Sequence, residues 1–242
     1  MIDLHCHLLP GIDDGPETLD EALCLAQFAV QHGIRRAVVT PHIHPGRYDN
    51  DLVTILPVFE AFKTALAARD IPLELGFAAE VHVDPAILAL VAEERMPFLG
   101  QVGEFRIILL EFPHGHIPVG SEKLVDWLLQ HQIRPIIAHP ERNKDIIRNW
   151  RKIAPFVSMG CWLQVTAGAM AGDFGPFARE TAETLLEQGW VKILATDAHN
   201  LEHRPPDMEA GRQAAAEVVG EAESWKLVRD NPAMISAKHF PN

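Results

Sequence analysis

The sequence has few cysteines, and their arrangement excludes a disulfide framework. Three occur in 242 residues, Cys6, Cys24 and Cys161, so their number is odd and their spacing is wide. Small secreted domains that depend on disulfides carry paired, closely spaced cysteines. We therefore expect free thiols, buried as small side chains, in a protein that works in a reducing compartment.

Long hydrophobic runs are also missing from the chain. No uncharged apolar stretch reaches the 18 residues or so that a membrane-spanning helix requires. The acidic N-terminus has no basic segment followed by an apolar one, so we expect no secretory signal. Together these features predict a cytoplasmic protein without membrane insertion.

Positive charge is scarce. The 21 lysines and arginines face 33 aspartates and glutamates, which gives a formal net charge of −12. Proteins that bind DNA or RNA through the phosphate backbone need a cationic surface, so nucleic acid is not expected as a general partner. Histidine is abundant by contrast, with 13 residues, several of them beside acidic residues.

Alternating apolar segments predict a single α/β domain over residues 1–242. Apolar residues make up 48% of the chain, which is enough for a sizeable core. Buried strands alternate with amphipathic helices about seven times, a pattern typical of a parallel sheet. The strands are expected at residues 2–4, 36–40, 73–79, 106–110, 135–138, 161–165 and 191–196. The helices are expected at residues 18–31, 50–69, 85–94, 121–132, 143–159 and 174–188, with a closing helical segment from about 206 to 242.

Polar side chains follow these strands directly, and this regularity is the most informative feature of the chain. In a β/α barrel the carboxyl ends of the strands build the active site. His5 and His7, alone, would be a weak signal, because a His-x-His pair is often just a polar strand end. Six strand ends supply side chains able to bind metal: His5 and His7, His42, Glu80, Glu111, His139, and Asp197 with His199.

The candidate ligands number nine when Asp14, shortly after the first strand, is added. Five histidines and four carboxylates exceed the needs of one zinc ion. They suit two or three divalent ions that share bridging carboxylates, and the mixed donors fit Mn, Fe or Zn better than Ca or Mg. Three such ions would give the pocket a charge of about +2, which suits an anionic ester as substrate.

Two arginines stand close to these ligands in the sequence. Arg142 follows His139 by three residues, and Arg204 follows His199 by five. Arginine pairs with phosphate oxygens in a bidentate manner, so both are candidates for binding a phosphoryl group. Most arginines simply form surface ion pairs, but the position beside a ligand-bearing strand end favours the functional interpretation.

The ordered motifs MIDLHCHLLPGIDDGP, VVTPHIHPGRY, AEVH, LLEFPHGHIP, IIAHPERN, LQVTAGAMAGDFG and ILATDAHNLEHRPP resemble a known family. They are similar to those of the PHP superfamily, and more narrowly of its CpsB/YwqE-type bacterial protein-tyrosine phosphatases, which depend on manganese. The resemblance implies a distorted seven-stranded β/α barrel with three metal ions. It also implies that Arg142 and Arg204 bind phosphate, and that the substrate is the phosphotyrosine-bearing tail of a membrane tyrosine autokinase that controls capsular or exopolysaccharide synthesis.

The resemblance further implies a division of the ligands among the three ions. His5, His7, Glu80 and Asp197 would hold the first ion. Glu80, Glu111 and His139 would hold the second, and Asp14, His42 and His199 the third.

The remaining histidines receive simpler interpretations. His44, His114 and His116 are expected in polar loops at the barrel mouth, although the last two could also contact substrate or protonate the leaving group. The others are expected to be ordinary, mostly solvated side chains: His82, His131, His203 and His239.

The hypothesis for the reaction is direct attack of a metal-bound hydroxide on phosphorus. No cysteine begins the Cys-x5-Arg loop of a thiol-dependent phosphatase, and the side chain of Cys6 is expected to face away from the two histidines beside it. Three alternatives stay open: a small-molecule phosphatase of the histidinol-phosphate type, a nuclease or proofreading domain, and a non-catalytic binding module. The sequence makes no prediction of the oligomeric state.

Overall fold

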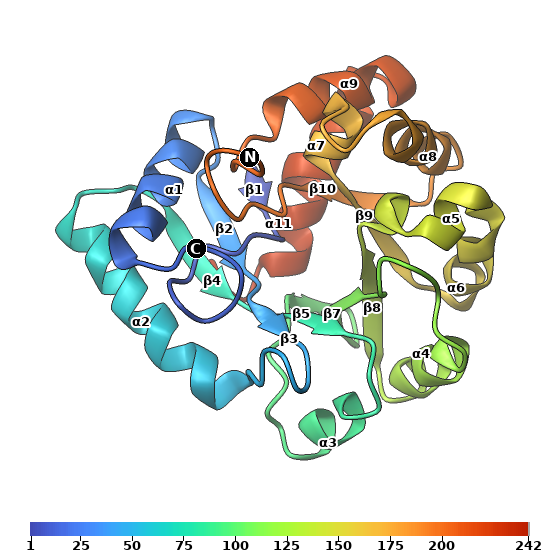
Figure 1. Ribbon diagram of the computed structural model, residues 1–242, viewed down its shortest axis with the longest axis horizontal. Helices are drawn as coiled ribbons and strands as arrows, with labels where there is room; N and C mark the ends of the chain where they lie inside the picture. The colour runs from blue at the N-terminus through green and yellow to red at the C-terminus, as the bar shows by residue number, and fades with distance from the viewer. Residues whose placement is uncertain (242) are drawn as a thin grey trace.

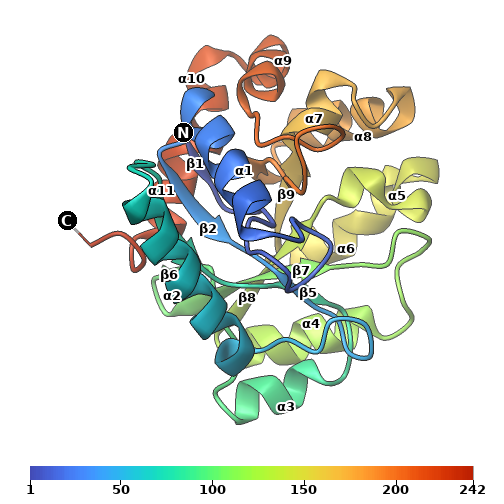
Figure 2. The same cartoon turned by 60° about the vertical axis from the view of Figure 1, so that its left-hand side comes forward.

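The computed structural model describes residues 1–241 as a ring of short strands surrounded by helices (Figure 1; Figure 2). The strands are β1 Ile2–Asp3, β2 Arg36–Val39, β3 His42–Ile43, β4 Glu74–Phe77, β5 Glu80–His82, β6 Gly100–Val102, β7 Phe105–Glu111, β8 Ile133–Ala138, β9 Trp162–Thr166 and β10 Val191–Ala195. The α-helices are α1 Leu19–Gln31, α2 Leu52–Ala68, α3 Ile87–Ala92, α4 Ser121–Gln130, α5 Lys144–Arg148, α6 Ala154–Met159, α7 Ala167–Ala171, α8 Pro176–Glu187, α9 Glu209–Val219, α10 Glu221–Trp225 and α11 Asn231–Ser236. Short 3₁₀ turns η1 Pro140–Arg142 and η2 Trp150–Ile153 and the π-helical turn η3 Lys226–Asp230 complete the elements.

The strands pair in parallel, apart from the antiparallel hairpin of β6 and β7. One sheet has the order β1-β2-β4, and the other has the order β10-β9-β8-β7-β5-β3. Backbone hydrogen bonds continue the pairing from one sheet to the other on both sides: Glu80 N–H donates to Thr40 O over 3.3 Å, and His7 N–H donates to Ala198 O over 2.8 Å. β2 with β3, and β4 with β5, are therefore the two halves of bent strands, which leaves seven strand positions. This confirms the predicted α/β class and its distorted parallel barrel.

The inner faces of the strands carry an apolar layer below the strand ends. Side chains alternate between the two faces of a strand, so every second residue points inward. Ile107 and Leu109 lie buried in this inner cluster, and Glu111 is the next residue on the same face. Ala78 precedes Glu80 in the same way. The spacing places the carboxylates of Glu80 and Glu111 directly above this apolar layer.

The helices cover the outside of the ring and bury a second, larger apolar cluster against it. α1 begins at Thr18, whose side chain accepts from Glu21 N–H while the Glu21 carboxylate accepts from Thr18 N–H. α2 begins at Asp51 with a similar reciprocal cap. Such caps satisfy backbone donors that have no partner inside the helix, and they define the predicted starts of both helices.

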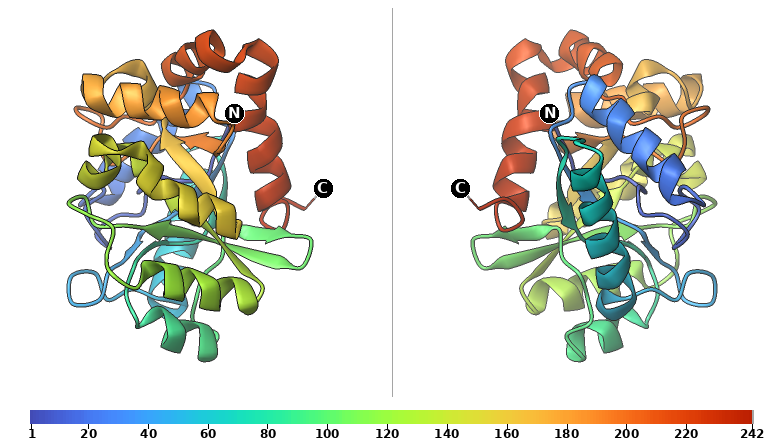
Figure 3. Two further views of the ribbon diagram at one scale, coloured as in Figure 1. Left: turned by 90° about the vertical axis from the view of Figure 1, so that its right-hand side faces the viewer. Right: turned by 90° about the vertical axis from the view of Figure 1, so that its left-hand side faces the viewer.

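Two expected helical segments differ in detail from the prediction. Residues 143–159 form α5, η2 and α6 in place of one helix, and Pro155 lies in the first turn of α6, where a missing N–H is tolerated. The segment from 206 onward divides into α9, α10, η3 and α11. α9 contacts α7, and α11 contacts β1 and β6, along one side of the molecule (Figure 3). α7 and β6 were not predicted, because each is too short to show a periodic pattern. Within residues 1–241, no helix combines the length and apolar character needed to cross a membrane.

Candidate metal centre

The nine side chains predicted as ligands converge at the carboxyl ends of the strands. Six of them line a cavity of about 460 Å³: Asp14, His42, Glu80, Glu111, His139 and Asp197. The other three, His5, His7 and His199, are buried directly behind it. Within this set, three groups have donor atoms that all lie within 4.8 Å of one another.

The first group joins His5, His7, Glu80 and Asp197, all of them buried. The Nε2 atoms of His5 and His7 lie 3.3 Å apart. Glu80 Oε2 lies 3.2 Å from each of these nitrogens. Asp197 Oδ1 lies 3.1 Å from His5 Nε2 and 3.4 Å from His7 Nε2. Two nitrogens and two oxygens therefore surround one point, as a divalent ion requires.

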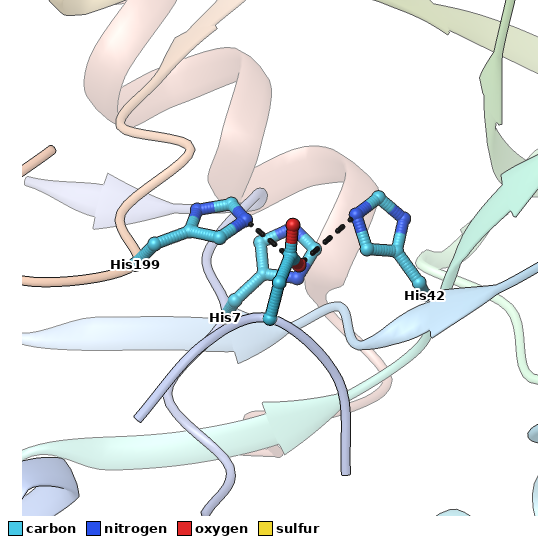
Figure 4. Close-up of side chains that lie close together, drawn as sticks. His7, His42 and His199 are labelled. Atoms are coloured by element: carbon cyan, nitrogen blue, oxygen red, sulfur yellow. Dashed lines mark ion pairs between the residues drawn. The ribbon is translucent and has the colours of Figure 1, made fainter. Parts of the chain in front are cut away.

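The second group contains His7, Asp14, His42 and His199. Figure 4 shows the three imidazoles arranged around one carboxylate, with dashed ion pairs to two of them. Asp14 Oδ1 lies 3.4 Å from His42 Nε2 and 3.3 Å from His199 Nε2. His7 thus belongs to two groups, whereas the resemblance assigns it to the first ion alone.

The third group contains His42, Glu80 and Glu111. His42 Nδ1 lies 3.2 Å from Glu80 Oε2 and 3.9 Å from Glu111 Oε2. His139 Nε2, expected here as a ligand, lies 2.8 Å from Glu80 Oε1 and 4.0 Å from Glu111 Oε1. Glu80 occurs in two of the three groups, in keeping with the expected bridging position.

Three further contacts orient the imidazoles, and the sequence alone did not reveal them. Gln164 Oε1 accepts from His5 Nδ1 over 2.9 Å, and Asp13 Oδ2 accepts from His7 Nδ1 over 2.6 Å. His199 Nδ1 donates to the Asp197 carbonyl over 2.8 Å. Each contact places the ring proton on Nδ1 and turns Nε2 toward the cluster, as outer partners of metal-binding histidines do. Only the adjacency of Asp13 and Asp14 hinted at one of them.

Two candidate ligands have unusual backbone conformations. His139 has φ of 30° and Asp197 has φ of 52°, both in the left-handed region that favours glycine. His139 directly follows β8 and Asp197 lies two residues after the end of β10, so each turn places its side chain at the cavity. Backbone of this kind costs about 1–3 kcal/mol per residue and persists where surrounding structure enforces it, commonly at functional sites.

Without bound metal, the cluster would balance its charges by binding protons. Burial alone would lower the pKa of His5, but the carboxylates of Glu80 and Asp197 outweigh it and raise that pKa to about 10. Burial would raise the pKa values of Glu80 and Asp197, but the nearby His5 holds both well below their usual range. Divalent cations would satisfy the same carboxylates and release these protons.

Buried polar atoms without hydrogen-bond partners, as well as the composition of the site, indicate that it fits divalent metal ions. His42 Nδ1, Glu80 Oε2 and His199 Nε2 are buried and have no hydrogen-bond partner, although other donors and acceptors lie nearby. A buried polar atom without a partner is costly. His42 Nδ1 and Glu80 Oε2 lie 3.2 Å apart, and His199 Nε2 lies beside Asp14, so cations bound within these groups would satisfy atoms that hydrogen bonds do not.

Arg142 and Arg204 reach the same carboxylate from different loops. Arg142 Nη1 forms a close ion pair with Asp197 Oδ2, and Arg204 Nη1 lies 3.3 Å from that oxygen. Both guanidinium groups line the cavity. His114 also lines it, and its Nε2 lies 3.3 Å from Arg142 Nη2.

Two histidines predicted to be solvated are not, and the prediction was wrong for them. His82 lines the cavity, stacks on His44 with ring centroids 4.0 Å apart, and places Nδ1 3.2 Å from Glu111 Oε2. His239 is half-buried, with Nε2 3.2 Å from the Phe98 carbonyl. Period-2 alternation from Glu80 could have indicated that His82 shares its face. His131, His203 and His116 are exposed as expected.

The cysteines are free and none lines the cavity among the residues described. Cys6 is buried and its Sγ lies 3.9 Å from the Val38 carbonyl, away from the imidazoles on either side. Burial raises the pKa of Cys6 well above its usual value and that of Cys161 to about 12. Both thiols are therefore unreactive, and the third, Cys24, is exposed on α1.

A comparison with known protein families establishes the family to which the chain belongs. The family described as "Capsular polysaccharide synthesis, CpsB/CapC" matches residues 1–236. The chain belongs to the CpsB/CapC family. This confirms the resemblance that the sequence motifs indicated.

Several members of the CpsB/CapC family have been named or solved. The chain is 33% identical to the tyrosine-protein phosphatase YwqE of Bacillus subtilis over 84% of this chain and 79% of that protein. It is 27% identical to the tyrosine-protein phosphatase CpsB of Streptococcus pneumoniae over 97% and 98% of the two chains. A crystal structure from work on YwqE and CpsB, described as unique metal-dependent tyrosine phosphatases, superposes with a TM-score of 0.89 at 29% identity, over 97% of this chain and 94% of that one.

Proposed function

We propose that this protein is a metal-dependent phosphomonoesterase that dephosphorylates tyrosine side chains. The observation that carries the proposal is the convergence of five imidazoles, four carboxylates and two guanidinium groups on one cavity. Such a cavity can hold divalent cations and a phosphate ester together. The phosphatases YwqE and CpsB, which the chain resembles over most of its length, support the same substrate class.

The proposed ligands are the nine that the sequence suggested, with two or three divalent ions and Mn as the preferred metal. His5, His7, Glu80 and Asp197 would hold one ion, and His7, Asp14, His42 and His199 would hold another. Glu80, Glu111, His42 and His139 lie where a third would bind. The bound ions would activate a water molecule at neutral pH and stabilise the charge of an in-line displacement.

Arg142 and Arg204 would position the phosphoryl group. Both guanidinium groups lie on one oxygen of Asp197 at the cavity edge. A cation held by Asp197 Oδ1 would draw charge from this carboxylate, weaken the ion pairs at Oδ2 and free guanidinium donors for the ester oxygens. The leaving tyrosine has a reference pKa near 10, so it departs more easily than an alkoxide and places a modest demand on an acid.

The proposed biological substrate is the phosphotyrosine-bearing tail of a membrane tyrosine autokinase that controls capsular or exopolysaccharide synthesis. The family description, which refers to capsular polysaccharide synthesis, supports this part of the proposal. We further propose a cytoplasmic location, where such a tail would be phosphorylated.

The test is turnover of matched substrates by the metal-stripped and Mn-reloaded protein. We expect the reloaded protein to hydrolyse a phosphotyrosine peptide well above the matched phosphoserine peptide, histidinol phosphate and single-stranded DNA. Stripped protein should be inactive, and Cys24→Ser should retain full activity. Preference for histidinol phosphate would favour the small-molecule alternative, and DNA cleavage the nuclease. Vanadate-sensitive activity that survives complete chelation would contradict the mechanism.

A further inference from the structure

The cavity has one apolar aromatic wall that the proposed chemistry does not use. Of the fourteen residues that line it, only Pro113 and Phe174 have wholly apolar side chains. Phe174 is half-buried and also borders a smaller hollow of about 250 Å³ with Ile147 and Ala178. A phenyl ring left partly exposed in a charged pocket is a surface that a second ring can cover.

Two contacts fix the position of this ring. A Cβ atom on Gly168 would lie 3.2 Å from Phe174 Cε2, so the ring packs almost directly on the backbone of α7. The guanidinium carbon of Arg142 lies 4.6 Å from the ring centroid. Cation–π contact of this kind leaves the donors at the guanidinium edge free for other partners.

The ring therefore stands beside the group proposed to bind phosphate. In an aryl phosphate only the bridging oxygen separates the phosphorus from the ring, so the ring must lie close to the phosphate. With the phosphate on Arg142, the leaving-group ring comes within reach of Phe174. Alkyl phosphates would offer no flat face to this wall.

We infer that Phe174, backed by Gly168 and Arg142, is the residue that selects aryl over alkyl phosphomonoesters. This rests on the proposed function and names its specificity determinant. The ring of Phe174 contacts the phenol ring of the substrate, while Arg142 and Arg204 contact the phosphoryl oxygens.

The test is equilibrium binding of two non-hydrolysable probes, phenylphosphonate and methylphosphonate, to the Mn-loaded protein. Phe174→Leu should weaken phenylphosphonate about five- to tenfold while methylphosphonate changes less than twofold. Phe174→Tyr should preserve the selectivity of the wild-type protein. Phe177→Leu is the matched control, because Phe177 is 69% exposed and does not line the cavity.

Equal weakening of both probes by Phe174→Leu would overturn the inference, because Phe174 would then act only by supporting Arg142. Unchanged binding of both probes would overturn it as well. Because binding needs no turnover, these outcomes are separate from the failure of the proposed function, which would appear as a wild-type protein that hydrolyses no aryl phosphate.

Discussion

The two halves of the barrel interior differ sharply although the same strands build both. The lower half is a dry layer that includes Val38, Ala78 and Leu109, all almost inaccessible to solvent. The upper half, one or two inward positions further along the same strands, holds His42, Glu80 and Glu111. The apolar layer stabilises the fold by removing surface from water, whereas the polar layer concentrates charge where burial opposes it.

The difference teaches that the upper layer is built for binding and not for stability. Its carboxylates are kept ionised by protonated imidazoles, and its backbone holds His139 and Asp197 in strained conformations. Buried ion pairs are weak evidence for stability, because desolvation can exceed their mutual attraction. Substitutions in the polar layer should therefore lower metal content and turnover, whereas substitutions in the apolar layer should lower the free energy of unfolding.

The largest effect is expected for Glu80→Gln. Glu80 belongs to two of the three ligand groups, so the amide should remove a shared donor and leave its imidazole neighbours uncompensated. We expect turnover of a phosphotyrosine peptide to fall by at least about 10³-fold, with fewer metal ions per chain. Metal analysis together with steady-state kinetics measures both.

The reciprocal control is Leu109→Ala, one inward position below Glu111. It should cost about 2–5 kcal/mol of unfolding free energy and leave the metal content unchanged. If Leu109→Ala lost the metal while Glu80→Gln kept it, the division between the two layers would be wrong.

A smaller loss of turnover is expected for Arg142→Ala and Arg204→Ala. Each removes a cationic donor from the phosphate position but no metal ligand, so turnover should fall about 10²- to 10³-fold at full metal content. Arg148→Ala is the control, because that side chain is 73% exposed on α5. Wild-type turnover in both cavity variants would remove their proposed role.

A still smaller effect, on metal affinity, is expected for Asp13→Asn. Asp13 accepts from His7 Nδ1, so the amide would weaken the orientation of that ring without removing a ligand. Metal affinity should fall about 10- to 100-fold, measured by competition with a fluorescent chelator. Asp20→Asn, whose side chain is 84% exposed, should bind metal as the wild type does; equal affinities for the two variants would show that Asp13 orients nothing.

The smallest effect is a difference in pH dependence between the metal-free and loaded protein. The folded-state pKa of His5 is raised to about 10, so its stabilising contribution is complete below about 6.5 and is lost as pH rises toward 10. Unfolding free energy of the metal-free protein should therefore fall between pH 7 and 9.5. The loaded protein has already released these protons, and metal binding strengthens with pH. Urea unfolding of both forms at pH 7 and at pH 9.5 measures this difference. The same change of unfolding free energy with pH in both forms would contradict the prediction.

Much of the site could be predicted from the sequence because its ligands are local. His5 lies two residues after the end of β1 and Glu80 begins β5, and a strand end fixes where the side chains beside it lie. Gln164 and Phe174 could not be assigned, because their roles depend on contacts with residues distant in the chain. The break between β4 and β5 was missed for a similar reason, since both halves lie in one continuous apolar run.

The most direct test of the central claim is anomalous diffraction from crystals of the Mn-loaded protein. We predict two or three anomalous peaks within the polar layer, with donor atoms of His5, His7, Glu80 and Asp197 around one of them. An absence of peaks in this layer from a fully active, Mn-loaded protein would contradict the claim that these side chains form its metal centre.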